Sequence, residues 1–331
     1  MLLYALIRTG TWILAVVAGC CSSSEDPPGA EEHDEEFLRC AVLDASGSES
    51  FARGRYRYER DGHELDVQGP KDGLAKVGAL AGLEDAGPAS IASIVELAGR
   101  MRVAEVEAIV VAGGIGTDEA SARAVLAPLA RLDVPVLLVP GASEPIEAFR
   151  AALASAREKA PNLVDMGVVR VARLPDLTVV SLPGGPRAHE LLAGEDGCGL
   201  TTEDVAEFGL LVRERPGALV VSATPPRQRG SAAIDIGRSG VGAGDPSVTR
   251  ALAKTRFGVF GYVYESGGRA ADRSGHRAVA EGAWSEELFL NVGAADALPR
   301  VSNDGALAAG MAALVEIRGR RARHSVLRTG D

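Results

Sequence analysis

Histidine and cysteine are scarce in this sequence, with five and four copies in 331 residues. Their spacing matches no zinc site, and no serine, histidine and acid are arranged as a nucleophile with its base would be. Basic side chains are not concentrated either, because the one cluster, "RGRRARH" at 318–324, is short. These absences argue against a zinc protein, a triad hydrolase and a nucleic-acid-binding protein.

The net negative charge comes largely from one short segment. The formal net charge is −10, and residues 25–36, "EDPPGAEEHDEE", contain seven acids and no Lys or Arg, so the remainder carries −3 (−10 plus 7). A nearly neutral body lacks the basic face that nucleic-acid binding needs. With 46% hydrophobic residues, the chain is long and apolar enough to bury a full core.

The first twenty residues, "MLLYALIRTGTWILAVVAGC", have one positive charge, at Arg8, and then an uncharged stretch over 11–19. This stretch is too short to span a membrane and is typical of an export signal. "VAGC" resembles a bacterial lipobox, in which Cys20 becomes the lipid-modified N-terminus. We therefore predict a signal peptide over 1–20, a disordered acidic tether over 21–36, and an exported bacterial lipoprotein of the cell envelope, expected at the outer membrane. An uncleaved hydrophobic anchor is the alternative.

The remaining two cysteines lie far apart in the sequence. Cys40 is in the apolar run "FLRCAVLD" and is interpreted as a small buried hydrophobe, whereas Cys198 is in the loop-like "GEDGCGLT". A disulfide between them is the alternative, which an exported protein would allow.

Strand-length apolar runs alternate with helical periodicity in the first half of the chain. The pattern predicts strands at 38–44, 107–113 and 134–141, with helices at 88–101 and 117–133 between them. Thr117 or Asp118 could cap the second of these helices. A β-α-β-α-β order of this kind indicates a parallel sheet with buried strands.

The second half mixes strands and helices differently. Residues 167–185 are expected to form two adjacent strands around a turn at Pro175, and Tyr262 and Tyr264 should project from one face of a strand. The other predicted elements are a helix at 201–216 capped by Thr201 or Thr202, strands at 217–226, 257–265 and 287–293, and a terminal hairpin at 311–327 that turns near Gly319.

Six loops follow the expected strands, and in α/β proteins such strand ends form the site. In order they are "VLDASGS", "VVAGGIG", "LLVPGASEP", "VVSATPP", "VFGYVYE" and "FLNVGAA". Together they resemble the signature of the calcineurin-like metallophosphoesterase family: D-x-H-G, G-D, P-G-N-H-E, S-H with prolines, G-H-x-H-E and N-x-G. The resemblance implies an α/β fold, a sandwich of two mixed β-sheets flanked by helices, over residues 37–328.

The glycines, prolines and acids that frame these motifs are retained, but the ligand positions that the resemblance assigns are not. Asp44 is the only ligand-type residue left among them. The remnant positions are Asp44, Ser46, Gly114, Ala142, Ser143, Ala223, Tyr262 and Tyr264.

Family members would hold two metal ions, which generate a nucleophilic water and stabilise charge on the phosphate. One carboxylate cannot hold two ions, so no intact catalytic residue and no cofactor are predicted. We expect an inactive, membrane-tethered protein that binds a ligand or an envelope protein partner, or serves as a structural module.

An active phosphoesterase with an altered metal site that uses Asp44 is the alternative function. The side chains that could join Asp44 are Asp118, Glu144, His189, Asp235, Glu265 and His276.

Overall fold

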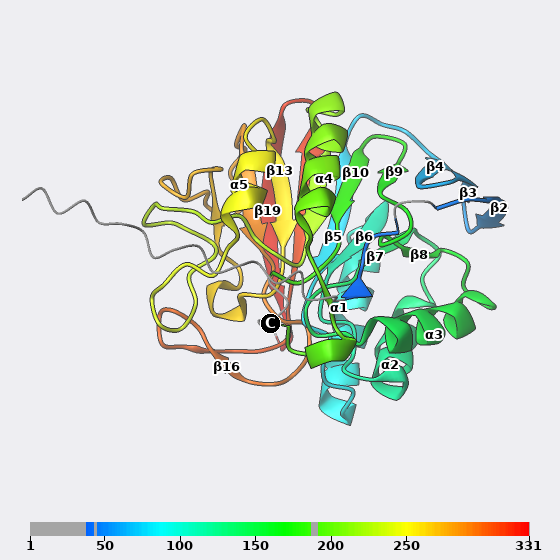
Figure 1. Cartoon of the computed structure of the whole chain (residues 1–331), viewed down its shortest axis with the longest axis horizontal. Coiled ribbons are helices and arrows are strands. Elements are labelled where there is room, and N and C mark those ends of the chain that lie inside the picture. Colours follow the sequence, from blue (N-terminus) through cyan, green and yellow to red (C-terminus); the bar gives the residue numbers. More distant parts are fainter. Residues whose placement is uncertain (1–37, 43–44, 187–190, 331) are drawn as a thin grey trace, which may run out of the picture. The chain divides into compact units, whose positions relative to one another are not determined.

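The computed structural model describes residues 38–42, 45–186 and 191–330 (Figure 1). The predicted signal peptide with Cys20, the acidic tether, Asp44 and His189 lie outside the described residues. Within the described ranges, no helix combines the length and the apolar character needed to cross a membrane.

One sheet has six strands, and its parallel part is formed within residues 75–165. The strand order is β19-β18-β5-β6-β7-β8, with β5 to β8 parallel and the terminal hairpin antiparallel beside β5. The strands are β5 (Ala75–Leu80), β6 (Ala108–Ala112), β7 (Val136–Val139), β8 (Leu163–Asp165), β18 (Met311–Arg318) and β19 (Arg321–Arg328). The helices that connect them are α1 (Pro88–Val103), α2 (Glu119–Leu129) and α3 (Ile146–Arg157).

The second sheet has nine strands in the order β14-β15-β13-β12-β10-β9-β4-β3-β2. They are β2 (Ser48–Arg53), β3 (Tyr56–Asp61), β4 (Glu64–Gln68), β9 (Val171–Arg173), β10 (Thr178–Leu182), β12 (Leu219–Ser222), β13 (Phe257–Phe260), β14 (Ala270–Ala271) and β15 (Leu288–Asn291). Its helices are α4 (Thr202–Glu214) and α5 (Pro246–Ala251). The short elements are β1 (Leu38–Arg39) with β11 (Cys198–Gly199), β16 (Arg300–Val301) with β17 (Leu307–Ala308), and the 3₁₀ helices at Gly194–Asp196 and Tyr264–Ser266.

Three apolar clusters hold these layers together. The largest lies between the sheets, where Val110 of β6 and Val221 of β12 belong to the same buried cluster. A second cluster joins α1, α2 and α3 to the six-stranded sheet, and a third joins α4 and α5 to the nine-stranded sheet. The predicted α/β fold, with two mixed sheets flanked by helices, is thus confirmed.

Two of the predicted helices begin where their capping residues indicated. Asp118 caps α2 through a hydrogen bond from the backbone N–H of Ser121, and Thr201 caps α4 through one from Asp204. Two side chains that satisfy otherwise unpaired N–H groups of the first turn explain why both helices begin where the sequence indicated.

Two strand predictions were wrong. Among the described residues of the predicted strand 38–44, only Leu38–Arg39 form a strand, which pairs with β11 outside the main sheets. The strand that precedes α1 in the parallel unit is β5, whose small residues and Gly78 gave no strand signal. The antiparallel strands β2, β3 and β4 were also missed.

The predicted strand 257–265 stops at Phe260. A Cβ at Gly261 would lie 2.1 Å from the carbonyl oxygen of Ala112, so the chain passes close to β6 here and turns. Tyr262 has φ 65° and Tyr264 begins a 3₁₀ helix. The two tyrosines therefore do not project from one face of a strand.

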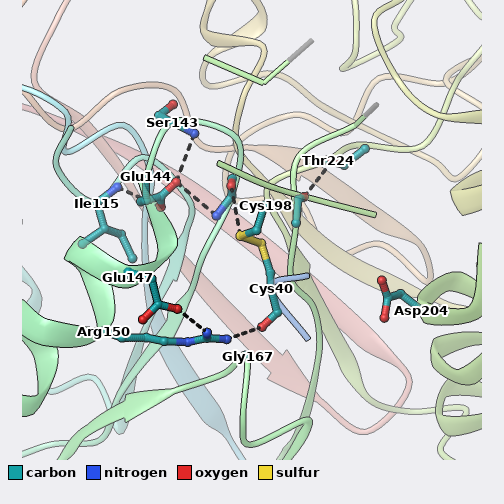
Figure 2. Close-up of a disulfide and its surroundings, with 12 residues drawn as sticks. Cys40, Ile115, Ser143, Glu144, Glu147, Arg150, Gly167, Cys198, Asp204 and Thr224 are labelled. Atoms are coloured by element: carbon teal, nitrogen blue, oxygen red, sulfur yellow. Dashed lines mark hydrogen bonds and ion pairs between the residues drawn. A yellow bond between two sulfur atoms is a disulfide. The ribbon is translucent and has the colours of Figure 1, made fainter. Parts of the chain in front are cut away.

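Cys40 and Cys198 form a disulfide, with Cα atoms 5.1 Å apart (Figure 2). The interpretation of Cys40 as a free buried hydrophobe is corrected by this bond. The parallel pairing of Leu38 with Cys198 explains how residues 158 positions apart meet. The bond lies beside the loop after β7, since the Cys198 sulfur is 3.9 Å from the carbonyl oxygen of Gly141.

Candidate functional site

Loops from the carboxyl ends of β5, β6, β12 and β13 meet at one place. The backbone N–H of Gly82 donates to the carbonyl of Gly113, at 3.1 Å, which joins the loops after β5 and β6. A Cβ at Gly113 would lie 2.7 Å from that of Ala223, and one at Gly114 would lie 2.8 Å from the Tyr264 hydroxyl oxygen. Residues from both sheets are therefore in direct contact here.

The loop after β7 joins the same place. A Cβ at Gly141 would lie 2.6 Å from the Cβ of Ala223, and Ala142 and Ser143 follow Gly141 directly. The structure thus brings together five of the eight residues selected from the sequence: Gly114, Ala142, Ser143, Ala223 and Tyr264.

A carboxylate that the sequence did not single out lies at the centre. One Glu84 oxygen accepts hydrogen bonds from the Ser143 hydroxyl, at 2.6 Å, and from the Tyr264 hydroxyl, at 2.8 Å. The other accepts from Arg300 Nη2 at 3.1 Å. The side chains of Glu84 and Arg300 are only 16% and 19% exposed, so water screens this ion pair little.

Arg300 reaches the site from β16. Its guanidinium also pairs with the fully buried Asp296 and lies over the Tyr264 ring, 4.5 Å from the ring centre. Burial alone would lower the pKa of Arg300, but the carboxylates of Asp296 and Glu84 outweigh it and raise that pKa. Arg300 is therefore a permanent cation held between two acids and an aromatic face.

Tyr264 acts only as a donor in this cluster. Its burial, and then the negative charge of Glu84 that accepts its hydrogen bond, raise the pKa of the phenol well above its usual value. A neutral phenol is a poor metal ligand near pH 7. We call Glu84, Ser143, Tyr264, Asp296 and Arg300 the Glu84 network.

Glu144 has a different role. Its buried carboxylate accepts backbone N–H bonds from Ile115 at 2.9 Å, and from Gly141 and Ser143, both at 3.1 Å (Figure 2). Burial raises the pKa of Glu144 to about 7, although these hydrogen bonds act in the opposite direction. All three contacts are to loop backbone, so Glu144 fixes the shape of the loops after β6 and β7.

The first motif was assigned to the wrong loop. Ser46 is exposed and precedes β2, which is an edge strand of the nine-stranded sheet. The loop that stands beside Gly113 and Gly114 is 81–85, "AGLED", which follows β5. If β5 had been recognised in the sequence, Glu84 would have been identified as an acid that follows a strand. Asp296 and Arg300 follow the last motif, in a segment that has no recognisable sequence pattern.

A dinuclear metal centre does not fit the described residues. Gly82, Gly114, Ala142 and Ala223 offer no side-chain ligand atoms, and both Glu84 oxygens are engaged by donors, one of them cationic. A carboxylate at 114 would have its Cβ 2.8 Å from the Cα of Gly82. The residues present favour a closed hydrogen-bonded network over a pair of ions.

Acidic side chains do gather elsewhere. Among the described residues, carboxylates close enough to share a metal ion are those of Asp72, Glu107 and Asp176. Glu107 precedes β6 and Asp176 is in the turn between β9 and β10, so this group lies at the opposite strand ends from the Glu84 network. None of the candidates named for a relocated site belongs to it.

No family model matches the chain, and no curated protein matches its sequence. Solved structures do share its fold. The protein TT1561 of Thermus thermophilus is 14% identical with a TM-score of 0.51, and the match covers 76% of this chain and 98% of that one. A purple acid phosphatase from yellow lupin (Lupinus luteus) seeds is 8% identical with a TM-score of 0.50, covering 83% of this chain and 54% of that one. At such identities the likeness shows the metallophosphoesterase-like fold alone.

Proposed function

We propose that this protein is a catalytically inactive phosphoesterase-like protein, a degenerate relative of the calcineurin-like metallophosphoesterases. The Glu84 network carries the proposal. It fills the meeting point of the strand-end loops with side chains that satisfy one another, where a phosphoesterase would need ligands for two metal ions.

The charge of the network also opposes phosphate binding. Glu84 and Asp296 outnumber Arg300, so these three groups carry −1 (one minus two). The guanidinium is already paired on both sides and is not free to clamp a phosphate oxygen, which is what phosphoryl chemistry requires of an arginine. The remaining roles are binding of a ligand or an envelope protein partner, or a structural module.

The second part of the proposal is location: an exported lipoprotein, lipid-modified at Cys20 and held to a membrane of the cell envelope by an acidic tether over 21–36. The Cys40–Cys198 disulfide supports export, because such bonds persist mainly in oxidising compartments. Mass spectrometry of the mature N-terminus tests the lipid, with Cys20→Ser as the control. An unmodified, uncleaved N-terminus in the wild type would refute this part.

The decisive experiment on activity measures bound metal and turnover together. The full chain is supplied in turn with manganese, zinc and iron, and assayed with an aryl phosphate and an aryl phosphodiester. We expect no stoichiometric metal and no turnover. Stoichiometric metal with turnover that Asp44→Ala or Glu84→Gln abolishes, while the exposed Glu119→Gln does not, would establish the alternative, an altered phosphoesterase.

A further inference from the structure

A cavity of about 310 Å³ lies between α3 and the meander β2–β4, beside the segment from β8 to β9. Figure 1 shows β8 between these two parts of the chain. This volume is at the lower end of the range for small-molecule sites. The lining residues are Glu49, Phe51, Arg60, Leu65, Arg150, Leu153, Ala154, Arg157, Val164, Asp165, Val168 and Val169.

One part of the lining is cationic. Three arginines, Arg60, Arg150 and Arg157, face two acids, Glu49 and Asp165, so the lining carries +1 (three minus two). Glu49 is shared, because both of its oxygens accept from Arg157 Nη2, at 2.7 and 2.8 Å, and Arg60 Nε is 3.8 Å from it. One carboxylate therefore serves two guanidiniums.

The direct contacts of Arg150 are weak, although its charge also acts on the Asp165 carboxylate in the same lining. Its Nη1 is 3.1 Å from Glu147, whose side chain is 77% exposed, and its Nη2 is 3.5 Å from the Cys40 carbonyl oxygen (Figure 2). An exposed ion pair of this kind contributes little, and 3.5 Å is long for a hydrogen bond. Its planar donor fork can therefore turn to an acceptor in the cavity at small cost.

The rest of the lining is apolar. Leu65, Leu153, Val164 and Val169 are buried, and Phe51 stacks on Tyr58 with ring centres 4.4 Å apart. On α3, positions 150, 153, 154 and 157 have the spacing of one helix face, so this helix supplies charge and apolar surface together. A ligand would thus meet guanidinium groups at one part and hydrocarbon at another.

We propose that this cavity binds a small organic anion with an apolar chain, of the medium-chain carboxylate class. Arginine matches a carboxylate with two parallel N–H bonds, and a lining of +1 is neutralised by one negative charge. The apolar wall takes the chain, which removes its surface from water. This goes beyond the proposed function and does not depend on it, since no member of the Glu84 network lines the cavity.

Calorimetric titration of the full chain with octanoate tests the proposal. We expect one site per chain and binding at least tenfold tighter than that of octan-1-ol, which has the same chain without the charge. Acetate, which lacks the chain, should give no measurable heat. Octyl phosphate, with a second negative charge, should bind more weakly than octanoate.

Two variants locate the site. Arg150→Met keeps an apolar stem and should weaken octanoate binding about tenfold, while the matched Arg123→Met, in an exposed i,i+4 pair on α2, should leave it unchanged. Val168→Trp should fill the cavity and abolish binding. Octanol binding as tightly as octanoate, octyl phosphate binding more tightly, or octanoate binding unchanged in both cavity variants would each overturn the proposal. The ligand comparison needs only the wild type, so it stands even if a variant fails to fold.

Discussion

Replacing Arg300 by methionine is the sharpest test of the Glu84 network. The substitution keeps a flexible apolar side chain over the Tyr264 ring but removes the cation from between Glu84 and Asp296. Glu84 is 16% exposed and Asp296 is fully buried, so the two acids lose their partner where water compensates poorly.

The expected magnitude follows from that burial. Removing one partner of a buried ion pair costs about 3–5 kcal/mol, because the remaining charge is left uncompensated. Arg300 is partly accessible and methionine retains some packing, so we expect a loss of about 3 kcal/mol in the free energy of unfolding at pH 7. The exposed control Arg123→Met should cost less than about 0.5 kcal/mol.

Urea unfolding of a double-mutant cycle measures the coupling. Glu84→Gln keeps an oxygen to accept from Ser143 and Tyr264 but has no charge to pair with Arg300. The double variant should therefore lose less than the sum of the two single losses, by about 1 kcal/mol or more. A cost below about 1 kcal/mol for Arg300→Met, or additivity within about 0.5 kcal/mol, would refute the view that these groups form one buried network.

Three further predictions concern neighbouring features. The disulfide closes 158 residues, so chain entropy gives about 5 kcal/mol as the upper value for its contribution, and Cys40→Ala/Cys198→Ala should lower the free energy of unfolding without changing the folded spectrum; no change would contradict this. The pKa of Glu144 is raised in the folded state to about 7, so the contribution of this carboxyl group to stability is fully present below its unfolded pKa near 4.5 and is lost as pH rises through 7. The free energy of unfolding, measured relative to that of Glu144→Gln, should therefore fall between about pH 4.5 and 7 and then level off. Gly114→Asp should cost about 2 kcal/mol or more because φ is +75° and the new Cβ meets Gly82, and divalent metal should not restore the loss in thermal unfolding.

The sequence predicted elements that carry strong local signals. Capping by Asp118 and Thr201 and the turns at Pro175 and Gly319 depend on a few adjacent residues, so their chemistry is readable from the chain alone. Strand β5 is different: its small side chains and Gly78 fit only because Met101 of α1 packs against that glycine, with its sulfur 2.5 Å from where a Cβ would be. A tertiary contact of this kind produces no periodic pattern of apolar residues in the sequence.

The same distinction between local signals and tertiary contacts explains which site residues could be predicted from the sequence. Gly114, Ala142 and Ala223 could be identified because each lies in a motif that follows a predicted strand and retains its glycines or prolines. The structure brings the three residues together. Because β5 was not predicted, the first motif was assigned to the loop that contains Ser46, and Glu84 was not selected. An acid at a strand end can be recognised only when the strand before it is known.

The role of Arg300 could not be predicted from its neighbours in the sequence. It lies on a two-residue strand after the last motif, and its importance comes from Asp296, Glu84 and Tyr264, of which two are more than 30 residues away in the chain. A buried cation between two acids must form as a unit, because each member alone would be costly to bury. Glycine and alanine at strand ends can therefore be identified from a sequence, whereas the cation that compensates the Glu84 and Asp296 carboxylates becomes visible only in the fold.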